Sequence, residues 1–218
     1  MTTPASRDSA DSAARRRHFS MIRGFHLADI FTLANAGAGM AAIFAVLVHV
    51  RTRNPTDLLI AAALVAVALA FDVLDGRIAR WRHTHSIMGR ELDSLADVIS
   101  FGAAPAALAF GAGMDGGWDQ LILIYFVACG VSRLARYNVT AETLSAGAAK
   151  VKYFEGTPIP SSILLVAVLA LATWTGRLDD ALWLGVIELG PFRLHPLSAM
   201  FALSGSLMIS KTIHIPKL

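Results

Sequence analysis

The chain has few of the residues that a soluble protein uses to face water. Only 16% of its 218 residues are charged, against roughly 25% in a typical soluble domain. Apolar residues make up 55% of the chain, and they gather into long blocks. Such blocks are typical of a chain that crosses a bilayer rather than of an amphipathic core. The composition therefore excludes an ordinary soluble domain and predicts an all-α integral membrane protein, with membrane lipids and not nucleic acid as its surroundings.

Cysteine is almost absent as well. The single cysteine, Cys129, excludes an internal disulfide, so cysteine content says nothing about the redox compartment. Cys129 lies in an apolar run, and we interpret it as a small packing residue.

The first 27 residues differ from the rest. Residues 1–14 are small and polar and predict a disordered tail. Residues 15–27 are basic with interleaved Phe19, Ile22 and Phe25, which predicts an amphipathic helix at the membrane interface. Arginines before an apolar stretch also occur in signal peptides. The next block is long enough to span, however, and Asp29 and Asn35 interrupt it, so we expect a retained first span and one membrane domain over 28–218.

Six stretches qualify as membrane spans, since a helix needs about 20 residues to cross the hydrocarbon core. They are residues 29–50, 58–78, 92–113, 119–137, 159–176 and 194–210. The segment 181–190 is too short to cross alone. It is a re-entrant piece, a surface piece or an extension of a neighbouring span, and the sequence leaves these three open.

Lysine and arginine predict the orientation. With the N-terminus inside, 15 of the 19 lysines and arginines fall on inner segments. Inner segments carry the positive excess in membrane proteins. We therefore expect a cytoplasmic (inner) membrane protein with both termini in the cytoplasm.

Residues 72–97, DVLDGRIARWRHTHSIMGRELDSLAD, place many charges between two apolar blocks. Asp72 and Asp75 share one helix face by their i, i+3 spacing, and Asp93 and Asp97 share another by i, i+4. The short connection WRHTHSIMGR lets the two helices run antiparallel with these faces opposed. Four carboxylates then meet just inside the predicted cytoplasmic boundary.

Such a cluster is stable only when it is protonated or when a cation balances it. All-oxygen ligands suit Mg²⁺ or Mn²⁺, and two pairs can hold two ions that bridge a phosphate. The alternative is that these residues only cap helix ends in the headgroup layer, but carboxylates within a membrane are costly and usually functional. Gly76, Ala79 and Gly89 leave room for a ligand, and Arg80 can pair with a phosphate. The pattern indicates phosphoryl chemistry at the membrane surface.

The spacing Asp72-x2-Asp75-Gly76-x2-Ala79-Arg80-x8-Gly89-x3-Asp93-x3-Asp97 resembles the signature of the CDP-alcohol phosphatidyltransferases. This resemblance implies six spans, usually a homodimer, and a polar cavity open to the cytoplasm. It implies transfer of a phosphatidyl group from a CDP-linked lipid to an alcohol, with release of CMP. The four aspartates would bind two divalent cations, and Asp97 would also be the general base. Contacts to the CDP-lipid are implied for Gly76, Ala79, Arg80, Ser86 and Gly89.

The first span carries two further candidates. Family members often have Pro-Asn at its entrance, where this chain has Ala28-Asp29. Thr32 and Asn35 are predicted contacts of the nucleotide. The alternative is that Asn35 makes a hydrogen bond across helices while Gly37 and Gly39 allow close packing.

The alcohol is indicated by resemblance alone. The segments RLARYNV (133–139), KYFEGTPIPSS (152–162), LMISKTIHIPKL (207–218) and LDSLADVISFGAAPA (92–106) resemble members of the family that use serine as the acceptor of CDP-diacylglycerol. Glycerol 3-phosphate, inositol and inositol phosphate stay open as alternatives. The predicted acceptor or phosphate contacts are Arg133, Arg136, Asn138 and Lys152. Basic residues here can equally contact lipid headgroups.

Two other classes of protein agree less well with these residues. A small cation transporter predicts acidic residues spread over the depth of the bilayer, whereas here they gather at one end of two spans. A non-catalytic scaffold does not explain the complete metal pattern. The residues therefore favour an enzyme over a transporter or a scaffold.

Overall fold

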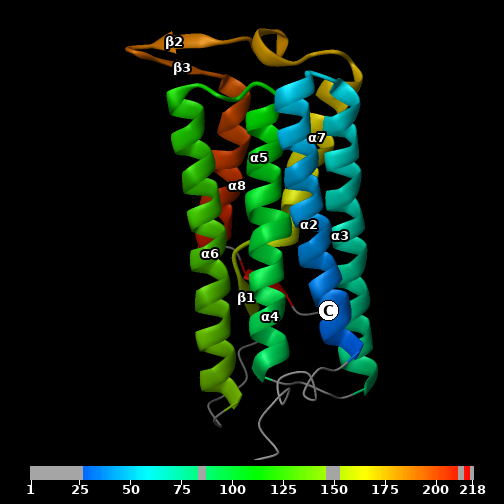
Figure 1. Ribbon diagram of the computed structural model, residues 1–218. Coiled ribbons are helices and arrows are strands. Elements are labelled where there is room, and N and C mark those ends of the chain that lie inside the picture. The colour runs from blue at the N-terminus through cyan, green and yellow to red at the C-terminus, as the bar shows by residue number, and fades with distance from the viewer. Residues whose placement is uncertain (1–26, 83–86, 146–152, 211–213, 217–218) are drawn as a thin grey trace, which may run out of the picture.

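The computed structural model describes residues 27–82, 87–145, 153–210 and 214–216, and these are mostly helical (Figure 1). The predicted tail and interfacial helix lie outside the described residues, as do Ser86 and Lys152. Ala79 and Arg80 fall within a helix, but their side chains are not described.

Four long helical rods run side by side (Figure 1). Helix α2 (Leu27–Thr52) and helix α3 (Pro55–Arg82) form a hairpin closed by a very short turn. The third rod is continuous but has three parts: α4 (Ile87–Asp97), the π-helix η2 (Val98–Ala103) and α5 (Ala104–Gly111). The fourth is α6 (Gly117–Ser145). Because α2–α3 and α5–α6 turn at the same end, the start of α2, the end of α3, the start of α4 and the end of α6 share the other end.

The C-terminal third contains shorter elements. Its helices are η3 (Ile159–Ser162), α7 (Ile163–Trp174), η4 (Asp179–Ala181), η5 (Pro196–Ser198) and α8 (Ala199–Ile209). Its strands are β1 (Tyr153–Glu155), β2 (Ile187–Leu189), β3 (Phe192–Leu194) and β4 (His214–Pro216). The pairs β1–β4 and β2–β3 are both antiparallel.

Four segments are long and apolar enough to cross a membrane, which supports an integral membrane protein. They are Asp29–Thr52, Pro55–Ile78, Met88–Gly111 and Gly117–Thr140. The predicted fifth and sixth spans are also apolar helices, but they are shorter, Ile159–Trp174 and Pro196–Ile209. Gly176 lies just after the end of α7 and has φ +70°, a left-handed backbone conformation that glycine adopts readily. Length therefore supports four spans and leaves the last two as a proposal.

Small residues let the helices approach closely. A Cβ on Gly111 would lie 2.7 Å from Val46 Cγ1 and 3.1 Å from Leu58 Cδ2, so α5 contacts α2 and α3 directly. The rings of Phe126 and Phe201 pack edge-on with their centroids 5.1 Å apart and join α6 to α8. Close helix contact through small residues is typical of membrane bundles.

The segment 181–190, whose position the sequence left open, forms the end of η4, a connection and strand β2. The hairpin β2–β3 lies at the end of the bundle where α6 begins (Figure 1). Trp118 Nε1 donates a hydrogen bond to the Leu189 carbonyl at 2.9 Å, and its ring meets Phe192 edge-on. The segment is therefore a connection and a strand at the end of the bundle rather than an extension of a helix.

Candidate active site

Three of the four predicted carboxylates come together between α3 and α4. Asp72 and Asp75 lie one turn apart on α3, and Asp93 lies on the facing part of α4. Carboxylate oxygens of these residues, one from each, lie within 4.8 Å of one another. The helical spacing and the short connection predicted this arrangement.

Asp97 lies one turn beyond Asp93 and is buried, with 7% of its surface exposed. It interacts electrostatically with Asp72 and Asp93, so it belongs to the same charged region. Asn35 Nδ2 donates a hydrogen bond to Asp97 Oδ1 at 3.4 Å. Asp97 therefore lies beside the group of three, held from the side of α2.

Helix α2 supplies two polar side chains to these carboxylates. Thr32 Oγ1 donates to Asp75 Oδ2 at 2.9 Å, and both side chains are buried. Asn35 makes the cross-helix hydrogen bond that was the alternative to nucleotide binding. Sequence reasoning placed Thr32 and Asn35 near the nucleotide but missed that they bond to the aspartates. Their i, i+3 spacing on one face was the available signal.

The chemistry of this cluster fits a divalent cation. Among the described side chains, no lysine, arginine or histidine forms an ion pair with any of the four aspartates. Asp93 Oδ1 is buried and has no hydrogen-bond partner there. Like charges at this separation repel each other strongly when they are partly removed from water. Carboxylate oxygens are hard ligands, which Mg²⁺ and Mn²⁺ prefer, and here no described side chain neutralises them.

Two of the predicted acceptor residues on α6, Arg133 and Asn138, interact with side chains of α4. Arg133 is partly buried, interacts electrostatically with Asp97, and keeps its Nε buried without a partner among the described residues. Asn138 is engaged by α4: its Nδ2 donates to Ser94 Oγ at 3.0 Å and to Glu91 Oε2 at 3.1 Å. Arg136 is partly buried on the same helix. The structure thus brings Arg133 to the carboxylates and occupies Asn138 elsewhere.

The small residues predicted to admit the CDP-lipid lie on the two helices that carry the aspartates. Gly76 follows Asp75 on α3, and Gly89 lies on the first turn of α4; both are partly buried. Nothing in the structure tests their contact with a ligand, and their role stays a prediction.

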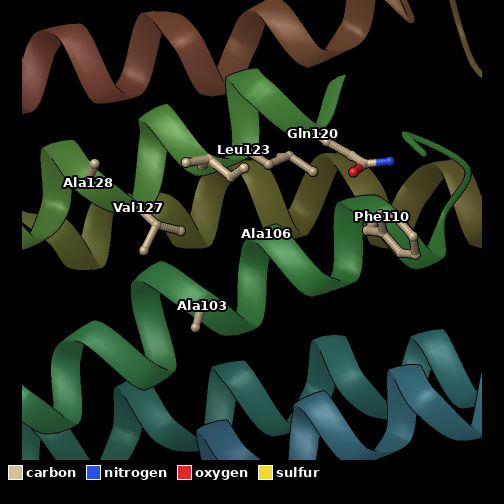
Figure 2. Close-up of a pocket in the computed structure, with 8 residues that line it drawn as sticks. Ala103, Ala106, Phe110, Gln120, Leu123, Val127 and Ala128 are labelled. Carbon is tan, nitrogen blue, oxygen red and sulfur yellow. The ribbon is translucent and has the colours of Figure 1, made fainter. Parts of the chain in front are cut away.

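A separate apolar groove lies between α5 and α6 (Figure 2). Its cavity volume is about 560 Å³. It is lined by Ala103, Ala106, Phe110, Gln120, Leu123, Ile124, Val127 and Ala128. Gln120 is the one polar residue in this lining, and no ionisable group is available there for phosphoryl chemistry. The groove is therefore not the reaction site.

Comparisons with known proteins agree with this site. A relative from Saccharomyces cerevisiae, named CDP-diacylglycerol–serine O-phosphatidyltransferase, is 40% identical over 220 residues, covering 100% of this chain and 80% of the relative. Proteins of the same name from Helicobacter pylori and Methanocaldococcus jannaschii are 37% and 35% identical over 66% and 68% of this chain. These two alignments cover 56% and 62% of the relatives, so the chain spans little more than half of their length.

The family model that matches is described as CDP-alcohol phosphatidyltransferase and covers residues 25–192. This range contains all four aspartates, together with Thr32 and Asn35 on α2. The predicted resemblance is confirmed, and with it the reading of a membrane transferase: the chain belongs to the CDP-alcohol phosphatidyltransferase family.

Proposed function

We propose that this protein transfers a phosphatidyl group from CDP-diacylglycerol to the hydroxyl of L-serine, giving phosphatidylserine and CMP. The observation that carries the proposal is the convergence of Asp72, Asp75 and Asp93, with Asp97 beside them. The choice of serine is supported by relatives whose names specify that acceptor.

The four aspartates are the proposed ligands of two divalent cations, Mg²⁺ or Mn²⁺. Cations held by these residues would neutralise the pyrophosphate and stabilise CMP as the leaving group. The unpartnered Oδ1 of Asp93 supports its role as a ligand. The hydrogen bond from Thr32 to Asp75 Oδ2 holds one carboxylate in place.

Asp97 is the proposed general base. The serine oxygen attacks the lipid-side phosphorus and forms a new P–O bond, while the bond from that phosphorus to the CMP oxygen breaks. Asp97 accepts the hydroxyl proton, which makes a weak nucleophile competent near neutral pH. Its hydrogen bond with Asn35 supports a fixed orientation of this carboxylate.

The remaining binding groups are assigned as follows. The CDP-lipid contacts are Thr32, Asn35, Gly76, Ala79, Arg80, Ser86 and Gly89. The acceptor or phosphate contacts are Arg133, Arg136 and Lys152, and Asn138 holds α4 beside them. The free Nε of Arg133 and its attraction to Asp97 support a place for the serine carboxylate beside the base. Asn138 contributes indirectly, because its amide already bonds to α4.

The proposed setting is the cytoplasmic membrane. Helices α7 and α8 complete a six-span fold that forms a homodimer. Residues 15–27 lie on the inner surface, both termini are cytoplasmic, and the carboxylates open to the cytoplasm. The arginines that flank the cluster support this orientation, since inner segments carry the positive excess.

The acceptor is tested by release of CMP from purified protein in lipid nanodiscs. The protein is supplied with CDP-diacylglycerol, Mg²⁺ or Mn²⁺, and one acceptor at a time: serine, glycerol 3-phosphate, inositol or inositol phosphate. We expect release with serine alone, with phosphatidylserine as the lipid product, and loss of release with EDTA. Release with a different alcohol would replace serine and keep the reaction. If folded protein released no CMP with any of the four acceptors, the proposal that it is an enzyme would be contradicted.

A further inference from the structure

Helix α2 comes very close to the backbone of the third rod at Gly39. A Cβ on Gly39 would lie 2.7 Å from the Ser100 Cα and nearer still to its Oγ, whereas a Cβ on Gly37 would meet nothing within 4 Å. Real Cβ atoms do not approach a backbone atom this closely. Gly39 therefore allows α2 to lie directly against the backbone of η2.

The partner in this contact also bonds to a residue of the candidate site. Ser100 is fully buried, and its Oγ donates a hydrogen bond to the Asn35 carbonyl at 2.9 Å. The side chain of the same Asn35 donates to Asp97. Ser100 thus bonds to the main chain of Asn35, while the side-chain amide of Asn35 bonds to Asp97, three residues before Ser100.

The backbone geometry explains why the contact falls here. The π-helix begins at Val98, directly after Asp97. A π turn contains one residue more than an α turn, so it rotates the helix that follows relative to the helix that precedes it. Asp93 and Asp97 can then face α2 and α3, while Leu108 and Ala109 of α5 enter the core.

We propose that Gly39 and Ser100 are positioning residues, which set the approach of α2 to the π turn and thereby place the Asp97 carboxylate beside Asp72 and Asp93. The effect on rate rests on the proposed function, but the effect on helix spacing does not. Neither residue touches substrate in this account; both act through Asn35 and Asp97.

The test compares two glycines on one helix. Gly39→Ala should push α2 away from η2 and lower kcat about 100-fold, because misplacement of a reacting group by about 1 Å has an effect of this order. The KM for serine should stay within about twofold, since an interaction made only in the transition state is lost. The KM for CDP-diacylglycerol should rise less than kcat falls, because Thr32 and Asn35 move with α2. Gly37→Ala adds the same methyl to the same helix and should keep kcat and KM.

Two further variants separate positioning from folding. Ser100→Ala removes the hydrogen bond without adding bulk, and should lower kcat by up to about 10-fold, the value of one hydrogen bond. Ser100→Gly, added to Gly39→Ala, removes the Oγ and Cβ that the new methyl would meet. It should therefore restore part of kcat.

A distance measurement tests the contact without activity. Spin labels at Leu33 and Leu95, which are exposed on α2 and α4, are introduced in a Cys129→Ala background. Their separation should increase in Gly39→Ala and stay unchanged in Gly37→Ala. If the unmodified protein released no CMP with any acceptor, the proposed function would fail while this distance still tested the inference. Equal kcat and equal label distances in the two alanine variants would overturn it, as would loss of folded protein with unchanged kcat.

Discussion

Two regions of the bundle bury carboxylates in opposite ways. At the end near the β2–β3 hairpin, Asp119 is fully buried and both of its oxygens bond to His195: the backbone N–H donates to Oδ1 at 2.9 Å, and Nδ1 lies 2.7 Å from Oδ2. At the other end, Asp72, Asp75 and Asp93 face one another, and one oxygen of Asp93 is buried without a partner.

The difference lies in what completes each site. Asp119 is completed by its own chain, and its bonds tie the start of α6 to the segment that precedes α8. The three facing carboxylates repel one another when they are ionised, and no described side chain pairs with them as a cation, so the group could hold a metal ion. Burial of an aspartate therefore does not by itself distinguish the candidate cation site from the pair at Asp119, whereas the partners of each carboxylate do.

The largest expected effect is on the chemistry at Asp97. Asp97→Asn should lower kcat about 1,000-fold, since it removes a general base whose contribution is typically 10²–10⁴-fold. The protein should still fold, because the amide retains an oxygen for the hydrogen bond from Asn35. The measurement is serine-dependent CMP release per folded protein, with Asp115→Asn, an exposed position, as the control. A rate near that of the unmodified protein would remove Asp97 from the reaction.

The opposite end should respond through stability. Asp119→Asn replaces an acceptor for His195 and should lower the free energy of unfolding by about 2 kcal/mol, as expected for a disturbed buried hydrogen bond to a charged group. The protein that remains folded should keep its kcat. Thermal unfolding in nanodiscs and CMP release, measured on one preparation, check both points. A fall in kcat as large as that of Asp97→Asn would erase the distinction between the two regions.

The smallest expected effect is an increase in stability rather than a loss. In EDTA, Asp72→Asn should raise the free energy of unfolding by about 1 kcal/mol, because it removes one like charge from the cluster. With Mn²⁺ present, the same variant should lose the stabilisation that a bound cation gives. Unfolding is followed with and without Mn²⁺, and Asp57→Asn on the far end of α3 is the matched control. Equal responses of the two variants would mean that Asp72 is not part of a cation site.

Much of this architecture could be predicted from local sequence. The apolar blocks predicted the four long helices, and the i, i+3 and i, i+4 spacings predicted that the aspartates share faces. The helices extend beyond the apolar blocks: α3 continues to Arg82 and α6 to Ser145, past the predicted ends at 78 and 137. Polar residues at the membrane surface continue a helix without adding to its hydropathy, so the blocks marked the bilayer rather than the helix ends.

Other features depend on contacts between distant residues. Asp119 and His195 are 76 residues apart, and their pairing follows from the way α6 and α8 pack. The π turn after Asp97 and the contact of its Ser100 with α2 have no signal in the sequence alone. The hydrogen bond from Thr32 to Asp75 likewise requires the α2–α3 hairpin to be in register.

The measurement that tests the comparison most directly is Mn²⁺ binding, followed by electron paramagnetic resonance on the protein in nanodiscs without substrate. The unmodified protein and Asp119→Asn should bind Mn²⁺ alike, and Asp93→Asn should bind it far more weakly. Equal Mn²⁺ binding by Asp93→Asn and the unmodified protein, or loss of binding in Asp119→Asn alone, would contradict the assignment of the carboxylates between α3 and α4 as the cation site.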